Sequence, residues 1–454
     1  MALDHPEFPK NARLVLASSG GSDSLGALVR LHGLLVDGTI SELSVVSVDH
    51  QLHPDSARWS AQACAQAQFF GVPAHVIPVT IPPQSEQGHR SLEARARLAR
   101  YAALAEWMVC QLPDAVLVTA HHAEDQAETV LLAALRGSGA AGLAAMPSWM
   151  RFANGWHWRP FLDVPRAALR ASAAESGLAF VTDPSNADLR HDRNYLRSEI
   201  LPRIQMRWPQ AVERLDQTAA QAAEDMGLLI ALAELDLGGS LDVTDLSIAR
   251  LTGLPRARLA NLLRAWMRRR GALMAPRARL RAFIDQLQQA APARLPTLAW
   301  GVWRITRYRD RLYWREPDVI VPSAPVTWTD KRHPVSWSDT QAWRLVPTNA
   351  SDPLAIDGRW LDQPWLLRIR QPQDRLRTQA RRPSRTLKNW FQARGVPPWV
   401  RETVVVIEIN GQLAGLTGYG VDLAFRPALG QDGWRVEGVL SAPVVKFAPD
   451  ADAD

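Results

Sequence analysis

The sequence predicts an α/β fold, in which a parallel sheet with helices on both faces is followed by a helical domain and a small α+β or mostly β C-terminal domain. Three observations lead to this prediction. Strand-like and helix-like patterns alternate over about the first two hundred residues, a helical pattern begins after Pro209, and short strand-like runs mark the C-terminal part. Alternation of strands with helices is typical of a parallel sheet. We expect three domains, at 1–210, 211–318 and 326–449.

The elements of the first domain follow from its hydrophobic pattern. Short apolar runs predict strands at Leu14–Ala17, Leu43–Val48, Ala74–Val79 and Ala115–Thr119. Helical spacing predicts intervening helices at Leu25–Leu35, Ser56–Phe70, Ser91–Val109 and Glu124–Leu135. Ligands bind such sheets at the carboxyl ends of the strands, so we expect the functional site there.

The remaining elements are predicted by a change of pattern. An amphipathic helix is expected at Ala211–Leu235, followed by a stretch, 256–281, with nine arginines and no acid. A proline-rich linker is expected at Glu316–Pro325. Short strands are predicted at Trp365–Ile369 and Val404–Ile409, beyond which a turn at Asn410–Gly411 indicates a mostly β domain.

Composition excludes several classes of protein. The chain is 47% hydrophobic and 22% charged, within the range of soluble globular proteins, and it has no apolar run of about 18 residues that could cross a membrane. Met1–Lys10 lacks the pattern of a secretory signal. Cys64 and Cys110 form no Cys-x-x-Cys pair, which argues against a disulfide framework and a cysteine zinc site and favours the reducing cytoplasm. A net charge of +6 does not by itself indicate nucleic acid.

A Ser-Gly-Gly-Ser-Asp-Ser loop separates the first predicted strand from the first predicted helix. Its two glycines let the backbone turn tightly and approach a ligand, and the N-terminus of the next helix favours a pyrophosphate group. The residues expected to bind the nucleotide are Ser19, Gly20, Gly21, Ser22, Asp23 and Ser24, with His50 at the end of the second strand. Asp23 would repel bare phosphate, so we expect it to bind a bridging Mg²⁺.

Other interpretations of this region remain open at this point. The loop is not the common P-loop, because it lacks the Gly-x-x-x-x-Gly-Lys-Ser/Thr pattern. It could be a Gly-Ser turn in which Asp23 and Ser24 cap the helix. His50 could equally be an ordinary histidine at a strand end. The loop resembles that of the PP-loop, or N-type, ATP pyrophosphatases, which split ATP into AMP and pyrophosphate, and this resemblance implies ATP as the cofactor.

A polar segment follows the fourth predicted strand, running HHAEDQAET from His121 to Thr129. Asp125 and Glu128 are three residues apart at a helix start, so they share one face. Their carboxylates could bind metal, accept protons or hold an ammonium group. The alternative is that they are acids favoured by the helix dipole, with His121 and His122 as caps.

The wider match decides between these interpretations. The segment 121–143 resembles that of the tRNA(Ile)-lysidine synthetases and, less fully, that of tRNA 2-thiocytidine thiolases. Further matching residues are Arg95, Arg97, Arg100, Tyr101, Arg159-Pro160, Asp183-Pro184-Ser185-Asn186, Arg193-Asn194-x-x-Arg197 and Leu201-Pro202. The alternative for the last series is helix capping by Asp183 and Asn186 together with surface arginines. Glu124 and Gln51 depart from the family, which often has Asp and Gly there.

A basic segment in the C-terminal domain predicts RNA binding. It contains no acid between its first and last cations, which are Arg375, Arg377, Arg381, Arg382, Arg385, Lys388, Arg394 and Arg401. Such cations give phosphate contacts, and the interleaved Trp390, Phe391 and Trp399 could stack on bases, although a place in the core is favoured for them. The segment 386–401 resembles the C-terminal domain of longer lysidine synthetases, with Gln373 where a glycine is expected. The arginines of 256–281 are a second candidate surface.

The resemblance implies a ligase that joins lysine to C2 of the wobble cytidine in the CAU-anticodon isoleucine tRNA. ATP would adenylate the cytosine oxygen with release of pyrophosphate, and lysine would then displace AMP. The implied partners are this tRNA, ATP, Mg²⁺ and free L-lysine, and a homodimer is left open. The implied catalytic residues are Asp23, Asp125, Glu128, Arg193 and Arg197. The residues expected to bind substrate are Arg97, His121, His122, Asp183, Asn186, Asn194, Arg377, Arg385, Lys388 and Arg401.

Two alternatives remain, another PP-loop tRNA-modifying enzyme and, from a different class, a binding protein without catalytic activity. A thiolase would need a sulfur donor, and the absence of suitably placed paired cysteines disfavours it. A non-catalytic tRNA-binding protein would not need an intact phosphate loop, so the intact loop of this chain argues against that alternative.

Overall fold

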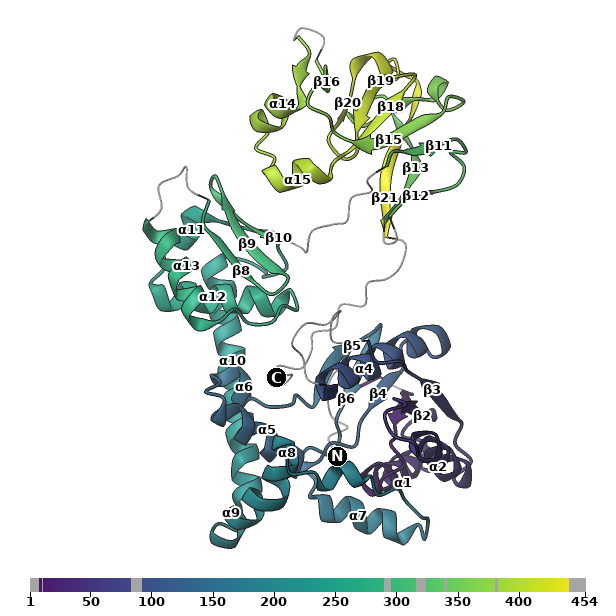
Figure 1. Cartoon of the computed structure of the whole chain (residues 1–454), viewed down its shortest axis with the longest axis vertical. Coiled ribbons are helices and arrows are strands. Elements are labelled where there is room, and N and C mark those ends of the chain that lie inside the picture. The colour runs from purple at the N-terminus through teal and green to yellow at the C-terminus, as the bar shows by residue number, and fades with distance from the viewer. Residues whose placement is uncertain are drawn as a thin grey trace. The chain divides into compact units, whose positions relative to one another are not determined.

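The computed structural model describes residues 8–9, 11–82, 92–289, 295–315, 324–338, 341–379 and 383–440, and every structural statement below concerns these residues (Figure 1). Arg381, Arg382 and most of the expected linker lie outside them. The chain forms two compact units. The described part of unit 1 falls within Met1–Asp242 and Asn261–Met274, and that of unit 2 within Val243–Ala260 and Ala275–Val444.

Unit 1 is built on a six-stranded sheet with the strand order β3-β2-β1-β4-β6-β5. Its strands are β1 (Arg13–Ala17), β2 (Glu42–Asp49), β3 (Ala74–Pro78), β4 (Val116–Val118), β5 (Trp149–Phe152) and β6 (Gly155–Trp158). β1, β2, β3, β4 and β6 run parallel, and β5 pairs antiparallel with β6. The β5–β6 hairpin, which turns at Ala153–Asn154, was not predicted, although an Asn-Gly pair between aromatic runs is a recognised hairpin signal.

Both faces of this sheet are buried, as a parallel sheet requires. Successive residues of β1 alternate between two apolar clusters, with Leu14 and Leu16 in one and Val15 and Ala17 in the other. The main helices of the sheet are α1 (Ser22–Val36), α2 (Ser56–Phe69), α4 (Leu92–Gln111), α5 (Ala123–Leu135) and α7 (Arg166–Glu175). Figure 1 shows α1 and α7 on one face and α4 on the other, which confirms the predicted fold class.

Helices α1 and α7 pack with their backbones in close approach. A Cβ atom added to Gly26 would lie 2.0 Å from the carbonyl oxygen of Leu169. Only a glycine therefore fits at this crossing, and the crossing determines where α7 lies beside the loop that precedes α1.

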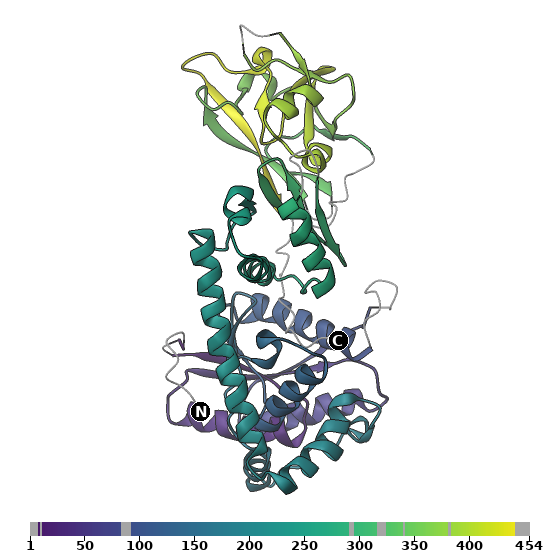
Figure 2. The same ribbon diagram turned by 90° about the vertical axis from the view of Figure 1, so that its left-hand side faces the viewer.

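The rest of unit 1 is helical. Its elements are α6 (Ala140–Leu143), a 3₁₀ turn (Pro184–Ala187), α8 (Asp192–Tyr195), a π-helical turn (Leu196–Ile200), α9 (Leu201–Arg207) and α10 (Ala211–Leu237). α10 is the long teal helix in Figure 2, and it packs against α5 and α6. It ends at Gly238, which adopts a left-handed conformation with φ of +71°. No helix in the described part of the chain is long and apolar enough to cross a membrane.

The region that was expected to be helical beyond α10 also contains a four-stranded antiparallel sheet, ordered β7-β10-β9-β8. The elements here are β7 (Asp245–Ser247), α11 (Ile248–Thr252), α12 (Arg256–Arg269), α13 (Arg277–Gln289), β8 (Thr297–Trp300), β9 (Trp303–Tyr308) and β10 (Arg311–Arg315). Polar residues, several of them arginines, interrupt the apolar residues of these strands, so their pattern was not recognised in the sequence.

The C-terminal part of unit 2 contains a five-stranded sheet (β11-β15-β18-β19-β20) and a four-stranded sheet (β12-β13-β21-β14), both antiparallel. The strands are β11 (Val326–Trp328), β12 (Val335–Ser338), β13 (Gln341–Asn349), β14 (Ile356–Asp357), β15 (Trp365–Ile369), β18 (Val405–Ile409), β19 (Gln412–Leu416), β20 (Gly420–Val421) and β21 (Asp432–Leu440). A small ribbon, β16 (Arg375–Leu376) with β17 (Arg385–Thr386), precedes α14 (Leu387–Ala393) and α15 (Pro398–Thr403). The mostly β C-terminal domain is confirmed.

Candidate active site

The phosphate loop turns at Gly20, which has a φ of +76°. A Cβ atom there would lie 2.9 Å from the carbonyl oxygen of Trp59. The Gly20 carbonyl accepts hydrogen bonds from the Val181 backbone N–H (2.9 Å) and from Gln66 Nε2 (3.0 Å). A glycine is therefore required by both the backbone conformation and the packing, and the loop is held rigidly.

The start of α1 is arranged to receive an anion. Its N-cap is Gly21, which has no side chain to cap the helix, so capping by Asp23 or Ser24 is not what the structure contains. Ser24 Oγ instead donates to the Gly21 carbonyl (3.0 Å) and lies 3.4 Å from Ser19 Oγ. The loop therefore offers hydrogen-bond donors to a pyrophosphate group: the first N–H groups of α1 and the hydroxyls of Ser19 and Ser24.

Asp23 projects from this loop into a group of basic side chains. Arg166 Nε lies 3.2 Å from each oxygen of its carboxylate, and Arg170 Nε lies 3.9 Å from Oδ1. His122 Nε2 is 3.8 Å from Asp23 Oδ2. Among the described residues, no three His, Cys, Asp or Glu side chains are grouped as a preformed metal site. Arg166 and Arg170, both on α7, were not predicted, because only the crossing at Gly26 brings them here.

The N-terminus of α5 is closed by a reciprocal cap. The Asp125 backbone N–H donates to His122 Nδ1 (3.4 Å), and the His122 backbone N–H donates to Asp125 Oδ2 (3.1 Å). His122 is 1% exposed. His122 therefore has the capping role that the sequence left open, and it also links Asp125 to Asp23.

Arg197 binds the two predicted carboxylates of α5 at once. Its Nε donates to Glu128 Oε1 (2.7 Å), and its Nη2 donates to Asp125 Oδ1 (2.7 Å) and Glu128 Oε2 (3.0 Å). The Glu128 side chain is fully buried, and burial raises its pKa although Arg197 opposes this. Burial also acts to lower the pKa of Arg197, but the two carboxylates outweigh it and raise that pKa. Arg197 lies in the π-helical turn, a feature often found at functional sites.

Other residues of the predicted series from Asp183 to Arg197 form hydrogen bonds, most of which shape the loop before α8. The Asp183 side chain accepts from the Ser185 backbone N–H (2.8 Å), and Asn194 Nδ2 donates to the carbonyls of Ser185 (2.9 Å) and Asp188 (3.0 Å). Arg193 Nη2 donates to Thr129 Oγ1 (3.3 Å). Asp183 thus caps the 3₁₀ turn, as the capping alternative expected, and the Asn194 side-chain amide is also hydrogen-bonded within the protein. Asn186 lies in the same 3₁₀ turn.

Two histidines, the half-buried His121 and the buried His157, lie at the carboxyl ends of β4 and β6. Thr119 Oγ1 lies 2.8 Å from His121 Nδ1 and 2.9 Å from His157 Nε2. Burial, together with Arg159 and Arg97, lowers the pKa of both histidines well below the ordinary value, so both imidazoles are neutral at pH 7. His157 was not predicted, because it belongs to the hairpin that the sequence analysis missed.

His50 and Arg97 lie at the same edge of the sheet. Burial and the nearby Arg100 lower the pKa of His50. The Arg97 guanidinium lies over the Tyr101 ring, 5.4 Å from its centroid. Arg97 and Arg100 also act on the pKa of His121. The predicted residues of α4 and β2 are therefore brought together with those after β4.

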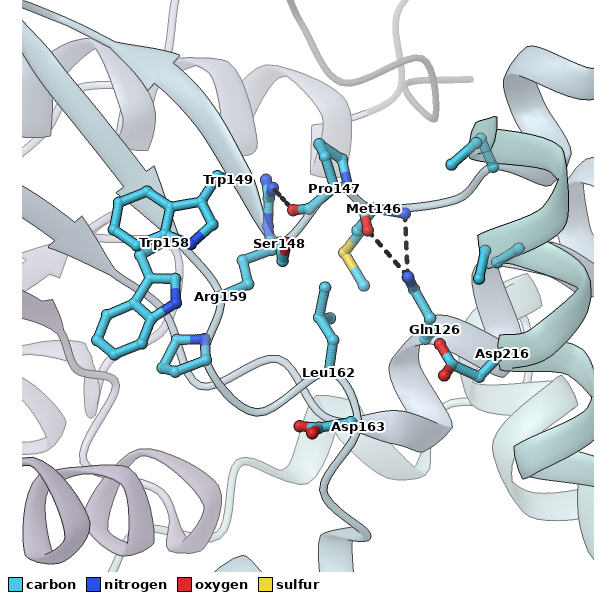
Figure 3. A pocket seen from close by; sticks show the side chains of 15 residues that line it. Gln126, Met146, Pro147, Ser148, Trp149, Trp158, Arg159, Leu162, Asp163 and Asp216 are labelled. Carbon is cyan, nitrogen blue, oxygen red and sulfur yellow. Dashed lines mark hydrogen bonds between the residues drawn. The ribbon is translucent and has the colours of Figure 1, made fainter. Parts of the chain in front are cut away.

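A pocket of about 380 Å³ lies beside α5 (Figure 3). The Gln126 side chain closes one wall by donating to the Met146 carbonyl (2.9 Å) and accepting from its N–H (3.0 Å). Leu162 adds apolar surface, and two carboxylates, Asp163 and Asp216, also line the pocket. Burial raises the pKa of Asp216, and the charge of Asp163 adds to this effect. Neither acid was predicted, because they lie on separate elements 53 residues apart in the sequence.

The basic segment of the C-terminal domain is only partly a surface. Arg377, Arg385 and Lys388 are exposed, as an RNA contact requires. Arg401 is not, because its side chain is buried, with Nε donating to the Val396 carbonyl (2.8 Å) and Nη2 to the Tyr308 hydroxyl (3.0 Å). The expectation that Arg401 binds RNA is therefore corrected: it holds α15 to the protein.

Two of the three aromatic residues of this segment have the core role that was favoured for them, whereas Trp399 is half-buried and packs against Tyr308 and Tyr313. Trp390 and Phe391 are buried in an apolar cluster with Leu387. The nearby loop that carries Gln373 is held by a buried ion pair, in which Asp374 accepts two hydrogen bonds from Arg368 (2.8 and 2.9 Å).

Comparison with known proteins agrees with this geometry. Three family models match the chain: a PP-loop domain at residues 3–204, a TilS substrate binding domain at 246–313 and a TilS substrate C-terminal domain at 366–438. Several curated relatives are named tRNA(Ile)-lysidine synthase. The protein of Alkalilimnicola ehrlichii is 37% identical over 90% of both chains. That of Xanthomonas axonopodis pv. citri is 36% identical over 88% of both. That of Burkholderia pseudomallei is 35% identical over 94% of this chain and 93% of its own.

This identity runs through nearly the whole length of both chains and crosses all three domain matches. It is therefore a relationship between whole proteins and not only between nucleotide-binding domains, and the chain belongs to the tRNA(Ile)-lysidine synthase family.

Proposed function

We propose that this chain converts the wobble cytidine of the CAU-anticodon isoleucine tRNA into lysidine, with ATP as activating substrate and free L-lysine as amine donor. One observation carries the proposal. The phosphate loop and the carboxylate pair belong to one site, since His122 Nε2 lies 3.8 Å from Asp23 and 3.4 Å from Asp125. A ligase that transfers AMP to a base and then accepts an amine needs both parts within reach of the same base.

The first step activates the cytosine. Its C2 oxygen is a poor leaving group, so it attacks the α-phosphorus of ATP and pyrophosphate departs. The loop Ser19–Ser24 and the N-terminus of α1 hold the phosphates. Arg97, Arg166 and Arg193 stabilise the charge that develops on the phosphoryl group, because a fixed cation requires no reorganisation during the reaction.

Mg²⁺ would be held by Asp23 together with phosphate oxygens of the nucleotide. It supplies neutralisation of phosphate charge. The residues present suit an ion that binds together with ATP, because Mg²⁺ is usually bound by one or two carboxylates with phosphates and water. Asp23 offers one such carboxylate, and the described residues do not provide a cage of three ligands.

The second step is attack of the lysine ε-amine on C2, with loss of AMP. A free lysine ammonium has a pKa of about 10.4, so a base must remove its proton. Asp125 is our candidate, because its side chain is 12% exposed whereas that of Glu128 is fully buried and anchors Arg197. Arg197 bridges the two acids and places a positive charge beside both carboxylates.

The pocket beside α5 supports L-lysine as the amine donor. Two carboxylates, Asp163 and Asp216, favour an ammonium group, and the apolar wall formed by Met146 and Leu162 suits a four-carbon chain. We propose that lysine is held here before transfer.

The test is incorporation of labelled lysine into an isoleucine tRNA with a CAU anticodon, in the presence of ATP and Mg²⁺. Incorporation should disappear when the metal is chelated and when the wobble cytidine is replaced by uridine. A requirement for a sulfur donor would indicate a thiolase instead. Absence of tRNA-dependent exchange between ATP and pyrophosphate would indicate a binding protein without catalytic activity.

A further inference from the structure

A second groove of unit 1, of about 640 Å³, lies where α9 meets α10. Leu131 of α5, Ile204 of α9 and Leu215 of α10 line it with apolar surface. Arg207, Trp208 and Arg214 also line it. None of these residues was singled out in the sequence, and the reaction described above does not use them.

The Trp208 ring is displayed on this groove and is not part of the core. The side chain is 61% exposed. Its backbone is held on both sides, because the Trp208 N–H donates to the Ile204 carbonyl (2.8 Å) and its own carbonyl accepts from Ala211 (2.9 Å). Single exposed apolar residues are common, but an exposed indole on a fixed backbone beside an apolar groove is typical of a binding surface.

The two arginines of the groove are available to an anion. Arg214 donates to the side-chain oxygens of Gln217 (2.8 Å) and Gln210 (3.3 Å), and the Arg207 guanidinium lies 5.8 Å from the Trp208 ring centroid. Within the described part of the chain, neither forms an ion pair with a carboxylate. Arg203, one helical turn before Arg207, is by contrast paired with Glu199 (3.0 Å).

A flat aromatic ring, an apolar floor and two cations are the combination that single-stranded RNA requires. Unpaired bases stack on aromatic rings while arginines contact the flanking phosphates. A protein partner would explain the apolar floor, but it would explain less well why two arginines that form no ion pair in the described part of the chain lie beside that floor. The charge of the groove therefore favours RNA as the occupant.

The groove also lies at the right distance from the proposed reaction site. Leu131 follows Glu128 on α5 by three residues, a rise of about 4.5 Å. Ile204 follows Arg197 by seven residues along nearly continuous helix, a rise of about 10 Å. Because stacked nucleotides in one strand are about 3.4 Å apart, these two rises correspond to about one to three nucleotides.

We propose that the Trp208 groove binds an unpaired base of the anticodon loop close to the wobble cytidine, with Arg207 and Arg214 at its phosphates. The proposal rests on the proposed function for the identity of the reacting nucleotide. The groove acts as a positioning site: it holds the loop so that the wobble base reaches the cluster formed by Asp125, Glu128 and Arg197.

The first experiment compares Trp208→Ala, Trp208→Phe and a matched control, Met206→Ala. Met206 is also an exposed apolar residue of α9, at 85%, but does not line the groove. We expect Trp208→Ala to raise the KM for tRNA about tenfold, as loss of one stacked base does, without changing the KM for ATP or lysine. Trp208→Phe should retain most of the affinity and Met206→Ala all of it. Equal values for Trp208→Ala and Met206→Ala would overturn the proposal.

The second experiment measures binding of anticodon stem-loops without ATP, so that it stands apart from the reaction. Each loop position in turn is made abasic. One abasic position should weaken binding by the wild-type protein but not by Trp208→Ala. Arg207→Ala and Arg214→Ala should each reduce the slope of log affinity against log salt by about 1. Base-independent losses for Trp208→Ala, or a changed oligomeric state with unchanged RNA binding, would contradict the proposal, the latter indicating an interface between two copies. If binding behaves as expected but no lysine is incorporated, only the proposed function fails.

Discussion

Arg197 is the residue on which the proposed chemistry of the site depends, because its guanidinium forms ion pairs with both Asp125 and Glu128. A buried carboxylate is costly unless it is paired and hydrogen-bonded. Glu128 meets this condition by accepting two hydrogen bonds from the planar guanidinium. A lysine ammonium is a point charge and cannot reproduce this geometry.

Arg197→Lys is expected to lower kcat/KM for lysine incorporation by roughly 10- to 100-fold, the effect of losing a charged hydrogen bond. Arg193→Lys is the matched control, since Arg193 makes one hydrogen bond, to Thr129. It should have a clearly smaller effect. Steady-state kinetics with labelled lysine decides this, and equal losses in both variants would argue against a special role for the bridge.

The pair His121 and His157 predicts a pH dependence of stability. Both pKa values are held well below the ordinary value of about 6.5 in the folded protein, first by burial and then by Arg159 and Arg97. The unfolded chain therefore takes up these protons first as the pH falls through about 6.5, and the folded state loses stability there.

Replacing His157 with Asn should accordingly make the Tm fall less between pH 7.5 and pH 5.5 than it does in the wild type. His53→Asn, at a ring that is 43% exposed, is the control, since it removes an imidazole that does not belong to this pair. Thermal melts at several pH values provide the measurement. An identical slope for His157→Asn and wild type would mean that the imidazole takes up its proton in the fold as readily as in the unfolded chain.

Asp216 provides a test of the lysine pocket. Asp216→Asn keeps the shape of the side chain but removes one of the two charges that face the cavity, so the KM for lysine should rise about tenfold, equivalent to about 1.4 kcal/mol of binding. The KM for ATP should not change. Asp225→Asn, on an exposed face of the same helix α10, is the matched control. If both variants bind lysine as the wild type does, the amine is held elsewhere.

At the scale of elements, the crossing of α1 and α7 controls the surroundings of the phosphate loop. The close approach at Gly26 brings α7 near enough for Arg166 to reach both oxygens of Asp23. A hairpin that the sequence analysis missed, β5–β6, similarly brings His157 beside Thr119. Elements far apart in the chain thus build the edge of the sheet where the predicted motifs end.

Gly26→Ala should therefore impair the use of ATP. The added methyl group would lie 2.0 Å from the Leu169 carbonyl, so α7 must move, at a cost of about 1–3 kcal/mol in stability. Gly33→Ala is the matched control on the same helix, because nothing lies within 4 Å of its Cβ, and it should stabilise the protein by about 0.5–1 kcal/mol. Chemical denaturation and ATP–pyrophosphate exchange measure the two effects. Retention of full exchange activity by Gly26→Ala would show that the crossing does not control the loop.

At the scale of the whole molecule, the predicted catalytic residues and the exposed cations of the basic C-terminal segment belong to different units. The phosphate loop and the carboxylates lie in unit 1, and the exposed cations Arg377, Arg385 and Lys388 lie in unit 2. Contacts between cations and phosphates release counterions, so their number appears in the salt dependence of binding.

The triple variant Arg377→Ala, Arg385→Ala, Lys388→Ala should reduce the slope of log affinity for tRNA against log salt by about 3. The rate of the reaction at saturating tRNA should not change. Arg332→Ala, at an exposed arginine paired with Asp330, is the control. Arg401→Ala should instead lower the Tm, because it breaks two internal hydrogen bonds. An unchanged salt slope in the triple variant would remove this surface from the RNA interface.

The sequence by itself determined the fold class, the phosphate loop and the family. These depend on local patterns: the alternation of strands and helices, a glycine that must adopt a φ of +76°, and motifs whose residues are close together in the chain. Asp125 and Glu128 could be named for the same reason, since helical spacing alone puts them on one face.

The tertiary structure decided which of these residues meet and which face solvent. Arg197 is 69 residues from Glu128, and Arg166 is 143 residues from Asp23, so no local pattern records either contact. Arg401 and Arg385 look alike in the sequence, yet one is buried and the other exposed, because burial depends on what packs against a side chain. The sequence shows that a residue is a cation but not what surrounds it. Only the fold determines whether the cation packs inside the protein, lies in the reaction site or is exposed to RNA.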